Sequence, residues 1–166
     1  MRLLWAVLAL CLVVPLSASH AGHWWEAGPP LPTLTGRVVD EAGLLSVADR
    51  RGLAAKLEAL EKGTGHQLVI VTTPSLRGQR IEDFGVRLGR SWGIGRCGVN
   101  DGVLLIVAPA ERQVRIEVGY GLERKLSDPE CAGIIRNDIL PSFRSGKMRD
   151  GIVAGARAII ERLGRR

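Results

Sequence analysis

The sequence predicts an α/β fold in which helices alternate with the strands of a mixed β-sheet. Three observations indicate this. Helical apolar periodicity recurs on both sides of a short β-branched segment at 67–73. A fully apolar run at 103–107 has the composition of a strand that is covered on both faces. A strand of alternating polarity follows at 114–118, after a short reversal.

The first half of the domain begins with a short predicted strand at 37–39, which ends at Asp40. Ser46 and Asp49 have the spacing of a helix capping box, and the helix that they begin ends at 63–65, where two glycines occur. The apolar stripe of this helix comprises Leu53, Leu57 and Leu60. The next strand then ends before a proline.

The second half adds three predicted helices to the two remaining strands. The first runs over about 80–92 and ends at a glycine pair. The next begins at Ser127, carries Pro129 in its first turn and closes at Pro141. The apolar side of the last helix comprises Ile152, Ala156, Ile159, Ile160 and Leu163. The link from 67–73 to 103–107 should be a parallel crossover.

The N-terminal residues resemble an export signal. Residues 1–21 combine a basic start, a short apolar stretch and small residues before a cut after Ala21. The stretch is shorter than the roughly 20 apolar residues of a membrane span. We therefore expect a periplasmic or secreted protein, with a membrane anchor as the alternative if the signal stays uncleaved. The composition of residues 22–36 predicts a flexible, proline-rich tether, and residues 37–164 are the predicted folded domain.

The charge is moderately basic, with a formal net value of +6 that falls to +5 once Arg2 leaves with the signal. The basic residues are spread along the chain, with few aromatic residues between them. This distribution and the export signal argue against nucleic acid as a partner. Weak attraction to an anionic membrane surface fits better. We expect a monomer that meets an envelope or membrane protein.

Polar residues follow or precede the antiparallel strands at one edge of the predicted sheet. Because the start of one strand lies beside the end of the next, Asn100, Asp101 and Glu123 should gather there, with Asp128 at the following helix start. Oxygen ligands on loops suit hard divalent cations, Ca²⁺ or Mg²⁺. Asp40 joins this group only if its strand is not parallel to its neighbour, which the sequence leaves open.

Each of these residues also has a structural interpretation. The segment 100–102 has the composition of a turn, Glu123 suits a solvated loop, and Asp128 suits a helix cap. No catalytic residue can be named. His66 is the only histidine within the predicted folded domain, and motifs for a nucleophilic serine, a phosphate loop or a zinc site are absent from the sequence.

Two cysteines remain after the predicted cleavage. Cys97 precedes the polar loop and Cys131 lies in the first turn of the helix that begins at the same edge. The chain reversal that gathers the oxygen side chains also brings these cysteines together. In an oxidising compartment we therefore predict a Cys97–Cys131 disulfide, with two independent thiols as the alternative.

The chain resembles the TPM-domain family over roughly 36–163. The motifs that carry the resemblance are Val39-Asp40-x-Ala42-Gly43-Leu44-Leu45-Ser46, Trp92-Gly93-Ile94-Gly95, Asn100-Asp101-Gly102-Val103-Leu104-Leu105, Gly119-Tyr120-Gly121-Leu122-Glu123 and Pro141-x-Phe143-Arg144-x-Gly146. The resemblance implies a three-layer α/β/α sandwich around a small mixed sheet. It also implies that Asp40, Asn100 and Asp101 are the first metal-ligand candidates.

The resemblance leaves two functions open. One is a non-catalytic module that binds a divalent cation and acts on an envelope or membrane protein. The other is a metal-dependent acid phosphatase, since some members of the family are described as such. We place the accessory module first, because the sequence supplies no convincing set of acid, base and nucleophile. A structural domain without a ligand is the third possibility.

Overall fold

The computed structural model describes residues 29–165, and the compact unit within it begins at Leu31. Its strands are β1 (Val38–Asp40), β2 (Gln67–Thr72), β3 (Gly102–Ala108) and β4 (Gln113–Val118). Its α-helices are α1 (Val47–Thr64), α2 (Ile81–Trp92), α3 (Asp128–Ile134), α4 (Leu140–Arg144) and α5 (Met148–Gly164). A 3₁₀ turn, η1 (Tyr120–Leu122), and a π-helical turn, η2 (Ile135–Ile139), complete the order.

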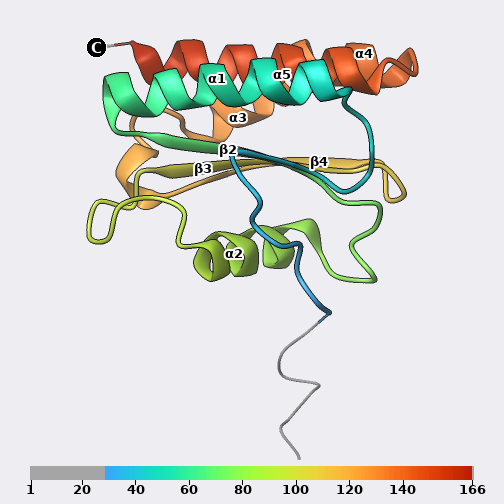
Figure 1. Ribbon diagram of the computed structural model, residues 1–166, viewed down its shortest axis with the longest axis horizontal. Helices are drawn as coiled ribbons and strands as arrows, with labels where there is room; N and C mark the ends of the chain where they lie inside the picture. The colour runs from blue at the N-terminus through green and yellow to red at the C-terminus, as the bar shows by residue number, and fades with distance from the viewer. Residues whose placement is uncertain (1–28, 166) are drawn as a thin grey trace, which may run out of the picture. The chain divides into compact units, whose positions relative to one another are not determined.

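The four strands form one mixed sheet in the order β1-β2-β3-β4. The first three are parallel and β4 runs antiparallel to β3. Helices α1 and α5, with α3 and α4, cover one face of the sheet, and α2 covers the other (Figure 1). The predicted three-layer α/β/α sandwich is therefore confirmed.

The core consists of two clusters, one on each face of the sheet. Side chains of β3 alternate between them: Val103, Leu105 and Val107 pack toward α1 and α5, whereas Leu104 and Ile106 pack toward α2. All seven residues of β3 are buried. The strand was expected to be covered on both faces, and the position of β3 between two layers explains its continuously apolar sequence.

The helix starts follow the sequence signals. Ser46 caps α1 in a reciprocal capping box with Asp49, as predicted. The prediction that Pro141 closes the third helix is wrong. The chain stays helical past it, because the π turn η2 widens the helix just before the proline, with Leu140 N–H bonded to the carbonyl of Ile135. This widening relieves the clash that a proline ring makes with the preceding turn.

The folded unit also begins earlier than the predicted boundary at residue 37. Leu31 packs against the α2-side core, Pro32 is buried, and the indole N–H of Trp92 donates to the Pro32 carbonyl at 3.0 Å. The end of the expected tether is therefore part of the domain. The predicted signal, 1–21, lies outside the described residues. Among residues 29–165, no helix has the length and apolar character needed to cross a membrane.

Candidate functional site

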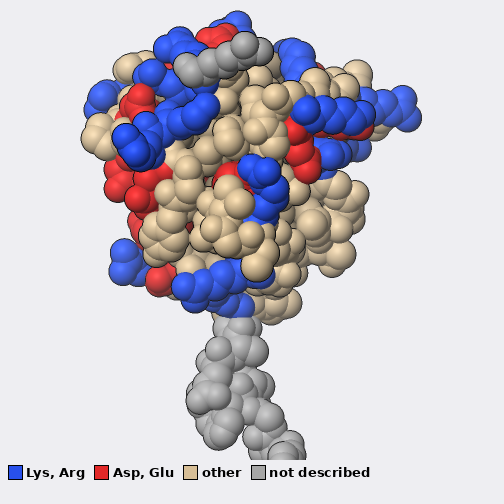
Figure 2. All heavy atoms as spheres, turned by 90° about the vertical axis from the view of Figure 1, so that its left-hand side faces the viewer, with Lys and Arg blue, Asp and Glu red and all other residues tan. Residues whose placement is uncertain are grey.

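A cleft of about 540 Å³ opens between α2, the edge strand β4 and the loops at the start of β3 and the end of β4. Its polar and charged lining side chains are Arg90, Arg96, Cys97, Asn100, Arg115, Glu117, Tyr120, Glu123 and Asp128. Figure 2 shows the end of the domain that carries these loops. Basic and acidic side chains are intermixed there, without a broad surface of a single sign.

Two glycines hold the loops of this cleft together. Gly119 N–H donates to the carbonyl of Gly102 at 2.8 Å, and Gly121 N–H donates to that of Asn100 at 3.1 Å. A Cβ atom on Gly121 would overlap the carbonyl oxygen of Val99. Only a residue without a side chain allows the two backbones to approach this closely. The expectation that the loop at 100–102 gathers with the loop after β4 is confirmed.

Asp101 lies at this edge but is turned into the protein, with only 1% of its side chain exposed. Arg96 holds it through its backbone N–H at 2.8 Å, its Nε at 2.7 Å and its Nη2 at 2.5 Å. His66 Nδ1 lies 3.6 Å from the same carboxylate. Burial alone would raise the pKa of Asp101, but the hydrogen bonds and charge of Arg96 outweigh it and lower the pKa.

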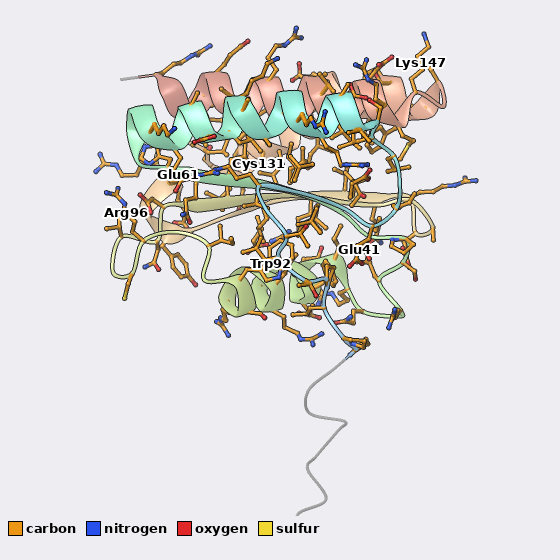
Figure 3. The ribbon with its side chains drawn as sticks, viewed as in Figure 1. Glu41, Glu61, Trp92, Arg96, Cys131 and Lys147 are labelled. Atoms are coloured by element: carbon orange, nitrogen blue, oxygen red, sulfur yellow. The ribbon has the colours of Figure 1, made fainter. Side chains whose placement is uncertain are left out.

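Asp40 lies at the opposite end of the sheet, because β1 is parallel to β2 and pairs Asp40 with Thr72. In Figure 3 the neighbouring Glu41 and the distant Arg96 lie at opposite ends of the domain. Asp40 therefore does not join the group around Asn100.

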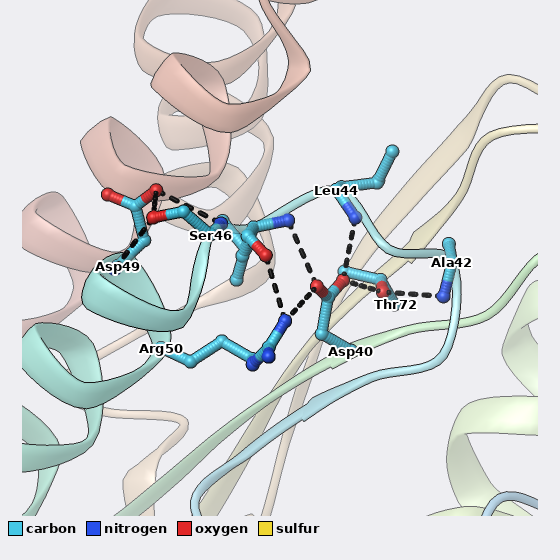
Figure 4. Close-up of polar contacts among 8 residues, drawn as sticks. Asp40, Ala42, Leu44, Ser46, Asp49, Arg50 and Thr72 are labelled. Carbon is cyan, nitrogen blue, oxygen red and sulfur yellow. Dashed lines mark hydrogen bonds and ion pairs between the residues drawn. The ribbon is translucent and has the colours of Figure 1, made fainter.

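The Asp40 carboxylate organises the loop into α1 (Figure 4). It accepts hydrogen bonds from Thr72 Oγ1 at 2.5 Å, Leu44 N–H at 3.0 Å and Leu45 N–H at 2.9 Å, and pairs with Arg50 at 3.3 Å. Burial opposes ionisation, but these donors together lower the pKa of Asp40. All of its acceptor capacity is used by donors from the loop, from Thr72 on β2 and from Arg50 on α1, so its place in the motif has a structural explanation.

Acid is expected to weaken the fold through Asp40 and Asp101. Because their pKa values are lowered in the folded state, their ionised forms contribute stability that is complete above about pH 4. This contribution is lost as the pH falls through the lowered folded-state values. Urea unfolding at a series of pH values should therefore show a steeper acid loss for the wild type than for Asp101→Asn. Parallel curves for the two proteins would contradict this.

Three predicted ligands differ from these buried aspartates. Asn100, Glu123 and Asp128 line the cleft, and their side chains have no hydrogen-bond or ion-pair partner within residues 29–165. The alternative that Asp128 caps a helix is wrong, because Ser127 is the N-cap of α3 and closes a capping box with Glu130. Asn100 is held in a left-handed conformation with φ of 53°.

The fit to a metal ion is limited. Within the described chain, no three His, Cys, Asp or Glu side chains are grouped closely enough to hold an ion by themselves. The cleft offers two unpaired carboxylates and the amide oxygen of Asn100, because Glu117 is paired with Arg115, so solvent water would supply the remaining ligands of a hard cation. Asp40 and Asp101 have protein donors in place of an ion.

The predicted disulfide is not present. Cys97 and Cys131 are both free thiols in the structure. Cys97 is exposed on the loop that lines the cleft, whereas Cys131 is buried between the sheet and the helical layer (Figure 3). Burial raises the pKa of Cys131 to about 11. The chain reversal brings their loops to one edge, but α3 turns Cys131 toward the core.

The partners of the two buried aspartates could not be identified from the sequence. Arg96 is five residues from Asp101, a spacing that does not bring side chains together in a regular helix or strand. Thr72 is 32 residues from Asp40. Only the parallel register of β1 and β2 brings Thr72 beside Asp40.

A larger hollow of about 640 Å³ between α1 and α5 is mostly apolar, with Glu161 as its only carboxylate. It contains none of the predicted site residues.

The chain belongs to the TPM domain family, whose sequence profile matches residues 38–162. The structure is similar to the N-terminal domain of a protein from P. gingivalis, determined in solution by NMR. The TM-score is 0.73 and the identity 39%, over 78% of this chain and 82% of that one. No curated protein matches the chain.

Two further solved structures show the same fold at lower identity. The N-terminal domain of cg2496 from Corynebacterium glutamicum has a TM-score of 0.60 and 18% identity, over 81% of this chain and 84% of that one. The BA42 protein from the psychrophilic bacterium Bizionia argentinensis has a TM-score of 0.61 and 19% identity, over 72% and 81%.

Proposed function

We propose that this TPM domain is an accessory module that binds a divalent cation at the rim of its cleft and docks on an envelope or membrane protein there. The observation that carries the proposal is the contrast among the acidic residues. The carboxylates of Asp40 and Asp101 accept hydrogen bonds from donors of the protein itself. The side chains that face the cleft without a partner in the described chain are Asn100, Glu123 and Asp128.

The cation, Ca²⁺ or Mg²⁺, is weakly held. The two carboxylates neutralise a divalent charge, but with the one amide oxygen they leave most coordination positions to water. The expected Kd is on the order of 10⁻⁴ to 10⁻³ M, which is the range of extracellular calcium modules. A site of this kind fits a compartment outside the cytoplasm, in agreement with the predicted signal.

The docking surface includes exposed apolar side chains around the same cleft. Tyr120 is 81% exposed on one wall, and Val86 is 37% exposed on α2 across from it. Val99, which directly precedes the lining residue Asn100, is 45% exposed. Aromatic side chains of this exposure at a concave surface are typical of protein contact sites. Open coordination positions on a bound cation would give a partner carboxylate or carbonyl a place to bind.

Affinity capture from an envelope extract tests this proposal. The wild-type domain should enrich a protein partner in millimolar calcium and release it in a chelator. Tyr120→Ser should lose the partner, whereas the control Val47→Ser should keep it, because Val47 is 53% exposed on α1, away from the cleft. Equal capture by both variants, or no calcium dependence, would contradict the proposal.

A metal-dependent phosphatase is the second candidate, and one observation favours it. Arg90 lines the cleft with no ion-pair partner in the described residues, so a phosphate group there would find a positive charge in the same cleft as Glu123 and Asp128. The cleft lining contains no serine, threonine or histidine. Phosphate release that needs added metal and is lost in Glu123→Gln would favour this candidate over the accessory module.

A further inference from the structure

Strand β4 is an open edge of the sheet. It pairs with β3 alone, and the bond from Gly119 N–H to the Gly102 carbonyl fixes which of its residues face β3. Antiparallel ladders alternate, so Arg115 and Glu117 direct their backbone groups toward β3. The N–H and C=O groups of Val114, Ile116 and Val118 therefore point outward, where the described chain provides no other strand.

The cleft reaches this edge at Ile116 and Val118. Its lining includes every residue from Arg115 to Tyr120 in succession. An opening over one face of a strand would be lined by alternate residues, because successive side chains point to opposite faces. An unbroken run indicates that the opening follows the edge of the strand itself.

The charges of β4 are complementary to those of a second β4. In an antiparallel pair centred on Ile116, Val114 lies opposite Val118 of the other copy, and Arg115 lies opposite the other copy's Glu117. The twofold axis repeats this contact, so two oppositely charged pairs form. These pairs fall at non-hydrogen-bonded positions, where side chains approach most closely. Within one chain, Arg115 and Glu117 already form an ion pair at 2.6 Å on the α2 side.

We propose that a second copy of this chain pairs with β4, and that the two sheets join into one through the outward groups of Val114, Ile116 and Val118. The outward groups in this register form roughly six backbone hydrogen bonds. The interface is isologous, as closed dimers require. The monomer expected from the sequence is the alternative outcome of the test below, and the proposed cation plays no part in this pairing.

Two features distinguish β4 from an edge that is protected against pairing, namely its length of six residues and its pattern of charge. Protected edges are very short, or carry proline or charged side chains, especially lysine, that disfavour a pairing strand. On β4 the opposing charges attract in the antiparallel register. The other edge, β1, has only three residues, and its short length suits a protected edge.

Charge reversal tests the register. The purified full-length protein should dimerise in sedimentation equilibrium over a concentration series that reaches about 1 mM. Arg115→Glu and Glu117→Arg each place two like-charge pairs across the axis and should weaken the dimer by roughly tenfold or more. An equimolar mixture of the two variants should restore it, as should the double variant R115E/E117R. Circular dichroism confirms that each variant is folded.

The matched control is Arg51→Glu, which makes the same charge change at an exposed position on α1 and should dimerise like the wild type. Amide exchange at Val114, Ile116 and Val118 should slow as the wild-type concentration rises. A wild-type protein that stays monomeric throughout overturns the proposal. So does a dimer that tolerates both reversals, or one that the mixture fails to restore.

Discussion

Replacement of Asp40 by alanine is expected to lower the free energy of unfolding by about 3 to 5 kcal/mol. The carboxylate is 1% exposed, and its removal leaves three donors without an acceptor: the N–H groups of Leu44 and Leu45 and the hydroxyl of Thr72. Arg50 also loses its counter-charge. Urea unfolding followed by circular dichroism measures the loss.

The adjacent Glu41→Ala is the control for this variant. Glu41 is exposed and its side chain makes no polar contact within residues 29–165, so the change should stay within about 0.5 kcal/mol. Asp40→Asn should fall between the two, because the amide retains one acceptor oxygen but places an NH₂ group against backbone donors. Equal stability of the Asp40→Ala and Glu41→Ala proteins would show that Asp40 does not organise the loop.

Gly121→Ala is expected to destabilise the domain by about 2 to 4 kcal/mol. The added methyl group would overlap the backbone carbonyl of Val99, which cannot rotate away as a side chain can. The loop that carries Glu123 must then separate from Asn100, so the variant should also lose the proposed cation. A thermal melt and a calcium titration measure the two effects.

Gly133→Ala in α3 is the matched substitution, because a Cβ at that position meets no atom within 4 Å. Alanine also favours the helix over glycine by up to about 1 kcal/mol. This variant should therefore melt at or above the wild-type temperature. If Gly121→Ala behaves in the same way, the close backbone approach does not hold the cleft together.

Local signals in the sequence were sufficient to predict the layers of the fold. The capping box at Ser46 and the unbroken apolar run of β3 depend on neighbours within a few residues, and the structure confirms both. The exception within the helices is Pro141. A proline ordinarily ends a helix, and only the π turn before it, which depends on packing against α5, lets the helix continue.

The site was predictable in position but not in the role of each residue. Because β3 and β4 are adjacent and antiparallel, the segment before β3, which contains Asn100, lies beside the segment after β4. Whether a carboxylate faces solvent or the core depends on partners that are remote or irregularly spaced, as for Asp40 with Thr72 and Asp101 with Arg96. The disulfide prediction is wrong for the same reason, because proximity of two loops does not fix the direction of a side chain.

The central claim is that Asp40 and Asp101 are buried structural residues, whereas the cleft residues Asn100, Glu123 and Asp128 bind the cation. Amide NMR during a calcium titration tests this claim most directly. We expect shifts at Asn100, Glu123 and Asp128 that saturate in the millimolar range and disappear in a Glu123→Gln, Asp128→Asn double variant. The amides of Leu44 and Leu45, which report on Asp40, should not move. Shifts centred on these two amides or on Arg96, or a spectrum unchanged by calcium and magnesium, would contradict it.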